Sequence, residues 1–149
     1  MKKFFFLLLA FIPFLVFAQS NDSAWVVNNY TKTETMVPMR DGSKLFTTIY
    51  APKDNTEKHP ILLERTPYSC APYGENIFRS YWNSPRMYFL KENYILIIQD
   101  VRGRWMSEGV FEDIRPYIPN NKSGKVDEAT DTYDAIDWMV KNINNNNGN

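Results

Sequence analysis

The sequence predicts an α/β fold with parallel inner strands, and three features support this prediction. Tyr94–Ile98 is an apolar run without polar alternation, which is typical of a strand buried on both faces of a sheet. The stretch Arg65–Asn93 separates this run from the apolar Pro60–Glu64 segment, and parallel strands require a crossover of that length. A helix with one apolar stripe is predicted over Asp127–Asn142.

The amino terminus has the pattern of an export signal. Lys2 and Lys3 precede the apolar stretch Phe4–Phe17, and a small-x-small cleavage site ends at Ala18. We expect a signal peptide over residues 1–18, a polar segment over 19–32 and one domain over 33–149. The mature protein is therefore expected to be periplasmic or secreted. No stable membrane anchor is expected, because the apolar stretch is shorter than the roughly 20 residues that span a bilayer.

The first strands are predicted to form a hairpin. Thr33–Met39 and Ser43–Tyr50 flank the pair Asp41-Gly42, and an Asp-Gly pair supplies the positive φ that tight hairpin turns need. Pro38 has no backbone donor, so the first strand should lie at a sheet edge.

The Arg65–Asn93 crossover is dense in aromatic residues and proline. We expect no long helix there, and only a short one over Arg86–Lys91.

The predicted carboxy-terminal helix begins at Asp127, a plausible N-cap. Its apolar stripe should pack on the sheet, and it consists of Ala129, Tyr133, Ile136, Val140 and Ile143. Carboxylates crowd the same helix, and we interpret them as a solvated surface rather than an acid–base pair. These are Asp127, Glu128, Asp131, Asp134 and Asp137.

The amino-acid composition disfavours several classes of function. Lys plus Arg equals Asp plus Glu at 17 each, so no basic stripe favours nucleic acid or an anionic membrane as partner. Cys70 is the only cysteine, which excludes an internal disulfide. Cys70 could be a nucleophile with His59 as its base, but structural roles for both residues are favoured. No metal or cofactor is expected, because the chain lacks a cluster of ligands with metal-binding spacing.

The charged loop after Tyr94–Ile98 has two interpretations. Arg102, Arg104 and Glu108 could bind an anionic substrate. The favoured alternative is that Asp100 and Arg102 tie the loop to neighbouring strand ends. Trp105 lines a pocket or packs in the core.

Tyr68 follows Pro67 where the chain leaves the carboxyl end of an inner strand. A phenol held there could donate a hydrogen bond to an oxyanion, but a tyrosine in an aromatic-rich loop also suits simple packing. The residues alone leave these alternatives open.

Four blocks of the sequence together resemble a known family. They are Val37–Gly42, Thr66–Tyr68, Gln99–Gly103 with Ser107–Gly109, and Asp131–Trp138. Their order and spacing are similar to the amino-terminal part of the Xaa-Pro dipeptidyl-peptidase-like serine hydrolases (peptidase family S15), closest to α-amino-acid ester hydrolases and glutaryl-cephalosporin acylases. The resemblance implies an α/β-hydrolase domain whose Ser, His and Asp cleave small esters, amides or short peptides through an acyl-enzyme. It also implies that the Tyr68 side chain helps to form the oxyanion hole.

The sequence departs from that family because it contains no Gly-x-Ser-x-Gly nucleophile elbow. The elbow should follow the strand after the Asp127–Asn142 helix, so we expect an amino-terminal fragment, truncated before that strand and inactive by itself. The Tyr94 strand should then have an open edge. The alternative is a non-catalytic exported binding module that uses the aromatic-rich Tyr68–Tyr88 region. The oligomeric state stays open.

Overall fold

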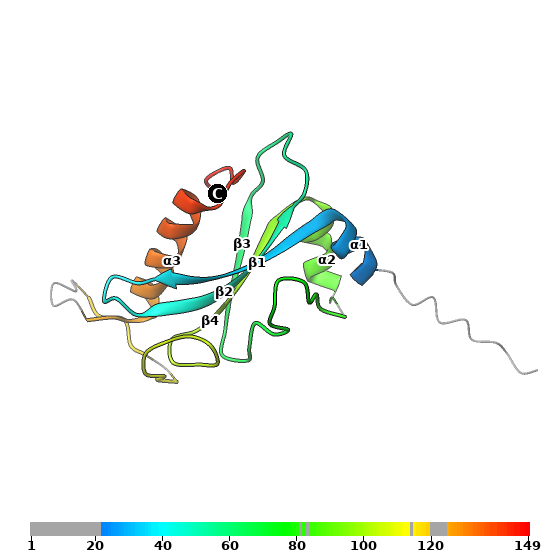
Figure 1. Ribbon diagram of the computed structural model, residues 1–149. Coiled ribbons are helices and arrows are strands. Elements are labelled where there is room, and N and C mark those ends of the chain that lie inside the picture. Colours follow the sequence, from blue (N-terminus) through cyan, green and yellow to red (C-terminus); the bar gives the residue numbers. More distant parts are fainter. Residues whose placement is uncertain (1–21, 81, 83, 114, 120–124) are drawn as a thin grey trace, which may run out of the picture.

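The computed structural model describes residues 22–149 except 81, 83, 114 and 120–124 (Figure 1). The expected signal peptide at 1–18 lies outside these residues. The elements in chain order are α1 (Asp22–Asn29), β1 (Tyr30–Pro38), β2 (Lys44–Pro52), β3 (Ile61–Thr66), α2 (Ser84–Lys91), β4 (Ile95–Asp100) and α3 (Glu128–Asn142). Within the described part of the chain, no helix has the length and apolar character needed to cross a membrane.

The four described strands form one mixed sheet in the order β1-β2-β4-β3. β1 and β2 pair antiparallel around the turn that contains Gly42, whose φ of 88° is the left-handed conformation expected for this position. β3 and β4 pair in parallel, with Thr66 opposite Asp100. These pairings confirm the hairpin, the edge position of the first strand and the parallel inner pair.

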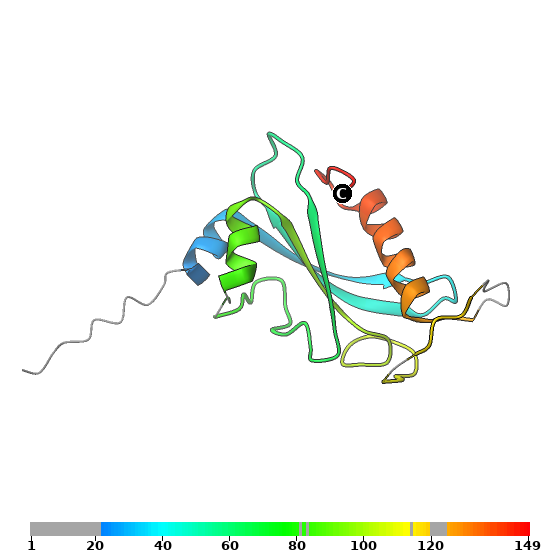
Figure 2. The same cartoon turned by 180° about the vertical axis from the view of Figure 1, so that it is seen from behind.

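β4 is buried on both faces, as its unbroken apolar sequence predicts. Ile95 and Ile97 belong to a core cluster with residues of α3, whereas Leu96 and Ile98 belong to a cluster with residues of α1 and α2. Figures 1 and 2 show α1 and α2 together on one side of the sheet and α3 on the other. The described chain is therefore a helix–sheet–helix sandwich.

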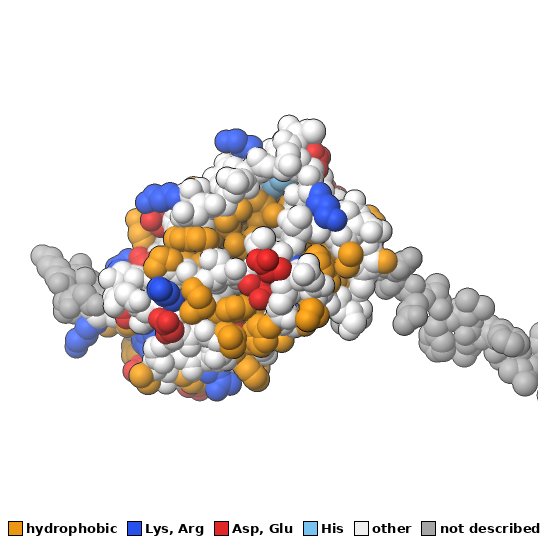
Figure 3. All heavy atoms as spheres, viewed as in Figure 1, with side chains coloured by type: hydrophobic (Ala, Val, Ile, Leu, Met, Phe, Trp, Pro, Cys, Tyr) orange, Lys and Arg blue, Asp and Glu red, His pale blue; other side chains and the backbone are white. Residues whose placement is uncertain are grey.

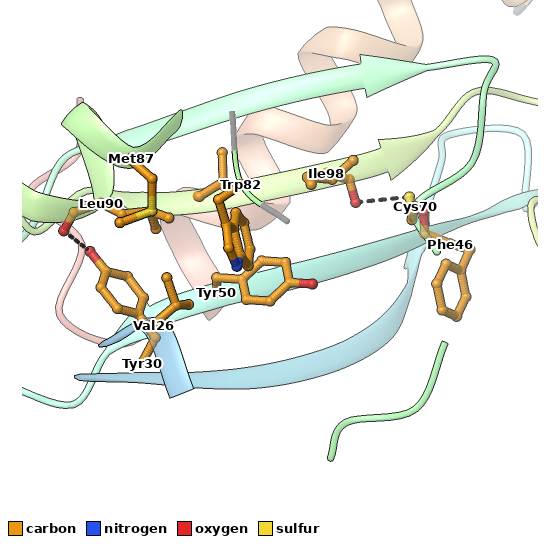
Figure 4. Packing of buried hydrophobic residues seen from close by; sticks show 10 residues of the cluster. Val26, Tyr30, Phe46, Tyr50, Cys70, Trp82, Met87, Leu90 and Ile98 are labelled. Carbon is orange, nitrogen blue, oxygen red and sulfur yellow. Dashed lines mark hydrogen bonds between the residues drawn. The ribbon is translucent and has the colours of Figure 1, made fainter. Parts of the chain in front are cut away.

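Trp82 of the aromatic crossover belongs to the cluster beside α1 and α2 (Figure 4), and Tyr73 and Phe78 pack against this cluster. The Trp82 and Tyr50 rings meet edge to face with their centroids 4.9 Å apart. The Tyr30 hydroxyl donates to the Leu90 carbonyl at 2.6 Å, which joins the start of β1 to the end of α2. Helix α1 was not predicted, because the segment was interpreted as part of a polar stretch, although half of its residues are apolar. Its Val26 is fully buried, and the expected boundary at 32–33 falls inside β1.

Helix α3 forms where it was predicted, but it presents a different face to the sheet. Tyr133, Ile136 and Val140 are 66%, 48% and 39% exposed, whereas Asp131, Ala135 and Met139 are buried. The small Ala135 side chain lets the helix lie close to the sheet, and an ion pair described below holds Asp131 inside. Figure 3 shows hydrophobic side chains exposed among charged ones on one face of the molecule.

The prediction that the Tyr94 strand has an open edge is wrong. β4 is paired on both sides, and β3 is the outer strand at that end of the sheet. The carboxy-terminal segment runs parallel to the start of β3. The His59 N–H donates to the Asn145 carbonyl at 2.7 Å, and the Ile61 N–H donates to the Asn149 carbonyl at 2.8 Å. Beyond Ile61, no described residue pairs with the outer side of β3.

The start of α3 is fixed by a capping box centred on Asp127. The Asp127 carboxylate accepts the N–H of Thr130 at 2.7 Å and that of Ile118 at 2.8 Å. The Thr130 hydroxyl in turn accepts the Asp127 N–H at 2.8 Å. The predicted N-cap is confirmed. The backbone N–H groups of Ile118 and Thr130 lower the pKa of the Asp127 carboxyl below its ordinary value.

We expect Asp127→Asn to change how stability depends on pH. A carboxyl with a lowered pKa in the folded state stabilises the fold above its unfolded pKa of about 3.9, and this stabilisation is lost as pH falls through the folded pKa. The asparagine can still cap the helix but does not titrate. Urea denaturation should show the native chain more stable than the variant at pH 7, with the difference shrinking below about pH 4. A difference that is constant from pH 7 to pH 3 would contradict this.

Candidate active site

The candidate site lies at the end of the sheet where β3 and β4 both finish. Because these strands are parallel, the segment after Thr66 and the loop after Asp100 emerge side by side. Ligands of parallel sheets gather beyond the carboxyl ends of the strands. This position brings Tyr68 next to the charged loop Val101–Gly109.

Three hydrogen bonds fix the peptide group between Pro67 and Tyr68. The Pro67 carbonyl accepts the indole N–H of Trp105 at 2.8 Å and the Nε–H of Arg104 at 3.3 Å. The Tyr68 N–H donates to the Thr66 hydroxyl at 3.0 Å. Both polar atoms of this peptide group are therefore held before any ligand binds.

The Tyr68 side chain itself is 83% exposed. Its ring does not fill the core, so the packing alternative does not describe this tyrosine. An exposed phenol on a fixed backbone can donate its O–H to a molecule that binds at this end of the sheet.

Asp100 organises the chain that follows Tyr68. Its buried carboxylate accepts the Cys70 N–H at 2.8 Å and lies 3.4 Å from the Tyr73 hydroxyl. The Asp100 carbonyl accepts the Ser107 hydroxyl at 2.6 Å. This buried residue thus links the Tyr68 segment to the loop after β4.

Trp105 was expected either in a pocket or in the core, and it is 60% exposed. Its φ of 51° is rare for a residue with a bulky side chain, and it directs the indole N–H toward the Pro67 carbonyl. Nearby, Gly103 has a φ of 68°, and a Cβ there would clash with the backbone of Phe111. The loop is therefore closely packed on itself.

Asp100 and Arg102 were expected to tie the loop to neighbouring strand ends, and both do so. Arg102 is buried and donates to Asp131 from Nε at 2.9 Å and from Nη2 at 2.6 Å. Its Nη1 donates to Asp41 at 2.8 Å. The hydrogen bonds from Arg102 to Asp131 raise the pKa of the guanidinium. Arg102 therefore joins the β1–β2 turn to α3, which is a structural role, as favoured, instead of binding a substrate anion.

The other charged residues of this loop also have structural partners. The Glu108 carboxylate accepts the Lys44 N–H at 2.9 Å, and the Glu108 N–H donates to the Lys44 carbonyl at 2.9 Å. The Arg104 guanidinium lies over the Phe111 ring, 4.7 Å from its centroid. Glu108 thus holds the loop against β2.

The prediction of a solvated acidic face on α3 is wrong for most of its members. Asp127 and Asp131 are buried, and the Asp134 carboxylate accepts hydrogen bonds from both Nε and Nη2 of Arg40. Glu128 pairs with Arg65 on β3 at 2.9 Å. The acidic residues hold α3 to the sheet because basic side chains from the strands and loops meet them.

Cys70 and His59 do not form a reactive pair. His59 precedes β3 and Cys70 follows it, so the two residues lie at opposite ends of that strand. Burial raises the pKa of the Cys70 thiol, which donates to the Ile98 carbonyl at 3.1 Å. The His59 ring contacts the Asp54 carbonyl at 3.1 Å. Among the described residues, no three His, Cys, Asp or Glu side chains lie close enough to hold a metal ion.

The sequence pattern of the X-Pro dipeptidyl-peptidase (S15) family matches residues 41–149. The chain belongs to the S15 family. Cocaine esterase from Rhodococcus sp. (strain MB1 Bresler) is 33% identical over 120 residues, which cover 78% of this chain and 18% of the esterase.

Solved structures give the same result for the fold. An α-amino acid ester hydrolase is 42% identical, with a TM-score of 0.69, over 80% of this chain and 20% of that chain. An aminopeptidase from a marine sediment Thaumarchaeota archaeon is 41% identical, with a TM-score of 0.67 and the same coverage. The described sheet and helices therefore match the amino-terminal part of the α/β-hydrolase fold. The chain spans about a fifth of the length of these three relatives.

Some residues that shape the site were not predicted from the sequence. Arg65 on β3 donates hydrogen bonds to Gln99, Glu128 and Thr132. No sequence motif indicated this role. The donation from Trp105 to the Pro67 carbonyl depends on a left-handed backbone that no residue type signals. The S15 match is what directs attention to Tyr68, whose role in an oxyanion hole stays a prediction.

Proposed function

We propose that this chain supplies the oxyanion-hole side of an exported serine hydrolase, which cleaves ester or amide bonds of small amino-acid-like acyl groups. The main support is the geometry of Tyr68, an exposed phenol on a backbone fixed by Thr66, Arg104 and Trp105. A donor that is already in place stabilises the tetrahedral intermediate without reorganising when the charge develops.

In this proposal, a serine on a strand that follows Asn149 attacks the substrate carbonyl. A histidine accepts the serine proton and later donates it to the leaving group, and an aspartate orients the histidine. The Tyr68 O–H donates to the carbonyl oxygen as that oxygen becomes negatively charged. No metal or cofactor takes part in the proposed reaction.

The outer side of β3 suits the strand that would carry this serine. Residues 145–149 already run parallel to its start, and the remaining edge is unpaired among the described residues. An apolar pocket of about 150 Å³ beside this edge is lined by Ile61 and Leu63 of β3 and by Ile136 and Val140 of α3. A strand added there would cover Ile136 and Val140 of the exposed stripe of α3.

The proposal can be tested with a chimera. Residues 22–149 of this chain would replace the matching segment of the α-amino acid ester hydrolase that is 42% identical. We expect the chimera to hydrolyse an activated amino-acid ester and to react with a fluorophosphonate at its serine. The 149-residue chain alone should do neither, because it contains no nucleophile elbow.

Two outcomes would contradict the proposal. Serine-dependent labelling of the 149-residue chain alone would show that the nucleophile lies within it. A chimera that folds, as judged by a cooperative thermal transition, but neither labels nor hydrolyses would show that this chain does not complete the site. The second result would favour the exported binding module. That alternative has less support, because Trp82, Tyr73 and Phe78 of the aromatic region pack in or against the core, which leaves Tyr68 and Tyr88 as its exposed tyrosines among the described residues.

A further inference from the structure

Lys32 on β1 is a buried lysine in an oxygen-rich environment. Its side chain has no solvent exposure, although β1 is an edge strand. The ammonium donates to the carbonyls of Pro72, Gly74 and Ile77, and the last two contacts are 2.9 Å long. A buried ammonium costs free energy unless such partners replace its water shell.

Glu34 completes this environment. One oxygen of its carboxylate lies 2.9 Å from the Lys32 ammonium and also accepts the Gly74 N–H at 2.8 Å. The Glu34 N–H in turn donates to the Glu75 carboxylate at 3.2 Å. The ammonium is therefore surrounded by three carbonyl oxygens and one carboxylate oxygen.

We propose that Glu34 and the 72–77 segment form a cation-binding site whose ligand is the ammonium of the chain's own Lys32. Carbonyl oxygens that converge on one point replace the hydration shell of a compact cation, as this arrangement does. The ligand class is a primary ammonium. The bound cation fixes the 72–77 segment against β1, and this role is independent of the proposed hydrolase activity.

The proposal differs from a purely packing role of Lys32. If the methylene stem is what matters, methionine should replace lysine well, because it fills a similar space without the charge. If the charge and its N–H donors matter, methionine should fail, and a free alkylammonium should restore the segment when the side chain is shortened to alanine.

The test uses Lys32→Ala and Lys32→Met in the full 149-residue chain. Hydrogen exchange at the Gly74 and Ile77 amides reports on the segment, because these amides donate to the Glu34 carboxylate and the Gly74 carbonyl. We expect exchange roughly 10- to 100-fold faster in both variants, since charge-assisted hydrogen bonds are lost. n-Propylammonium has the length of the atoms that alanine lacks, and it should slow exchange in the alanine variant only.

Matched controls separate the site from general effects of lysine and salt. Lys53 also donates to backbone carbonyls, those of Val27 and Asn28, but at an exposed position. Lys53→Ala should leave Gly74 exchange unchanged. Tetramethylammonium has the same charge as n-propylammonium but no N–H donor, so it should not restore the alanine variant.

Each outcome decides the proposal. If Lys32→Ala does not fold, n-propylammonium should restore its circular dichroism, and failure to do so would overturn the site. Native exchange rates in Lys32→Met would also overturn it. A measurement on the unmodified chain adds a check without any variant. Competitive acetylation should modify Lys32 at least about tenfold more slowly than Lys53, and equal rates would contradict the buried, liganded ammonium.

Discussion

Replacing Arg102 by methionine is expected to lower the free energy of unfolding by about 3–5 kcal/mol, because one partner of a buried ion pair is removed. The Arg102 side chain is 4% exposed, and that of Asp131 is fully buried. In the variant, Asp131 would keep Arg65 as its remaining cationic partner, whose Nη2 lies 3.8 Å away. Methionine fills much of the space of the arginine stem, so the loss reports on the weaker compensation of the Asp131 charge rather than on a cavity.

Urea denaturation of Arg102→Met and Arg40→Met would measure this effect against a matched control. Arg40 donates to both oxygens of Asp134 on the same helix, but its side chain is 39% exposed. Water and salt screen such a pair, so Arg40→Met should lose only a small fraction of the stability lost by Arg102→Met. Equal losses in the two variants would contradict the central role of the Arg102–Asp131 pair.

Tyr68→Phe in the active chimera is expected to lower kcat by about 10²–10³, the usual cost of losing one oxyanion donor. The change removes only the hydroxyl, and the fixed Pro67–Tyr68 peptide group remains. A donor that acts mainly in the transition state should lower kcat and leave KM nearly unchanged. Initial rates over a range of ester concentrations would separate the two constants.

Tyr88→Phe is the control for this experiment. Tyr88 is 71% exposed on α2 and lies outside the candidate site, so its substitution should leave kcat unchanged. A Tyr68→Phe chimera with a rate within about threefold of the parent would show that the phenol is not an oxyanion donor. In that case the S15 family assignment would stand, but the proposed role of Tyr68 would not.

Much of the sheet could be predicted from local pattern. The uninterrupted apolar run at Ile95–Ile98 indicated a strand with two covered faces, and the pair Asp41-Gly42 indicated the hairpin turn. The capping residue of α3 was also predictable, because Asp127 stands next to the apolar repeat. These signals are short-range and depend on one or two neighbouring elements.

The orientation of α3 could not be predicted in the same way. Counting hydrophobic residues favours the stripe with Tyr133 and Ile136, but the helix buries Asp131 because the Arg102 guanidinium lies beneath it. That partner comes from a loop 29 positions earlier in the chain. A buried ion pair between distant segments overrides the amphipathic pattern, and the pattern contains no information about it.

The candidate site was likewise predictable only in part. Family resemblance and the Pro67-Tyr68 pair directed attention to the tyrosine, and its exposure agrees with a role in binding. The residues that fix its backbone could not be predicted. Trp105 and Arg104 reach the Pro67 carbonyl only because two strand ends meet, and Lys32 reaches its carbonyls only because β1 passes the 72–77 segment.

The strand order β1-β2-β4-β3 has a consequence for the order of folding events. The β1–β2 hairpin closes through a short turn, and isolated hairpins form in about 1–10 μs. β4 must instead find β2 across a long intervening stretch, with Thr47 opposite Gln99. Because closing a long loop costs chain entropy before any contact is made, we expect insertion of β4 to be the slow step. Until β4 pairs with β2, β2 would be hydrogen-bonded to β1 alone.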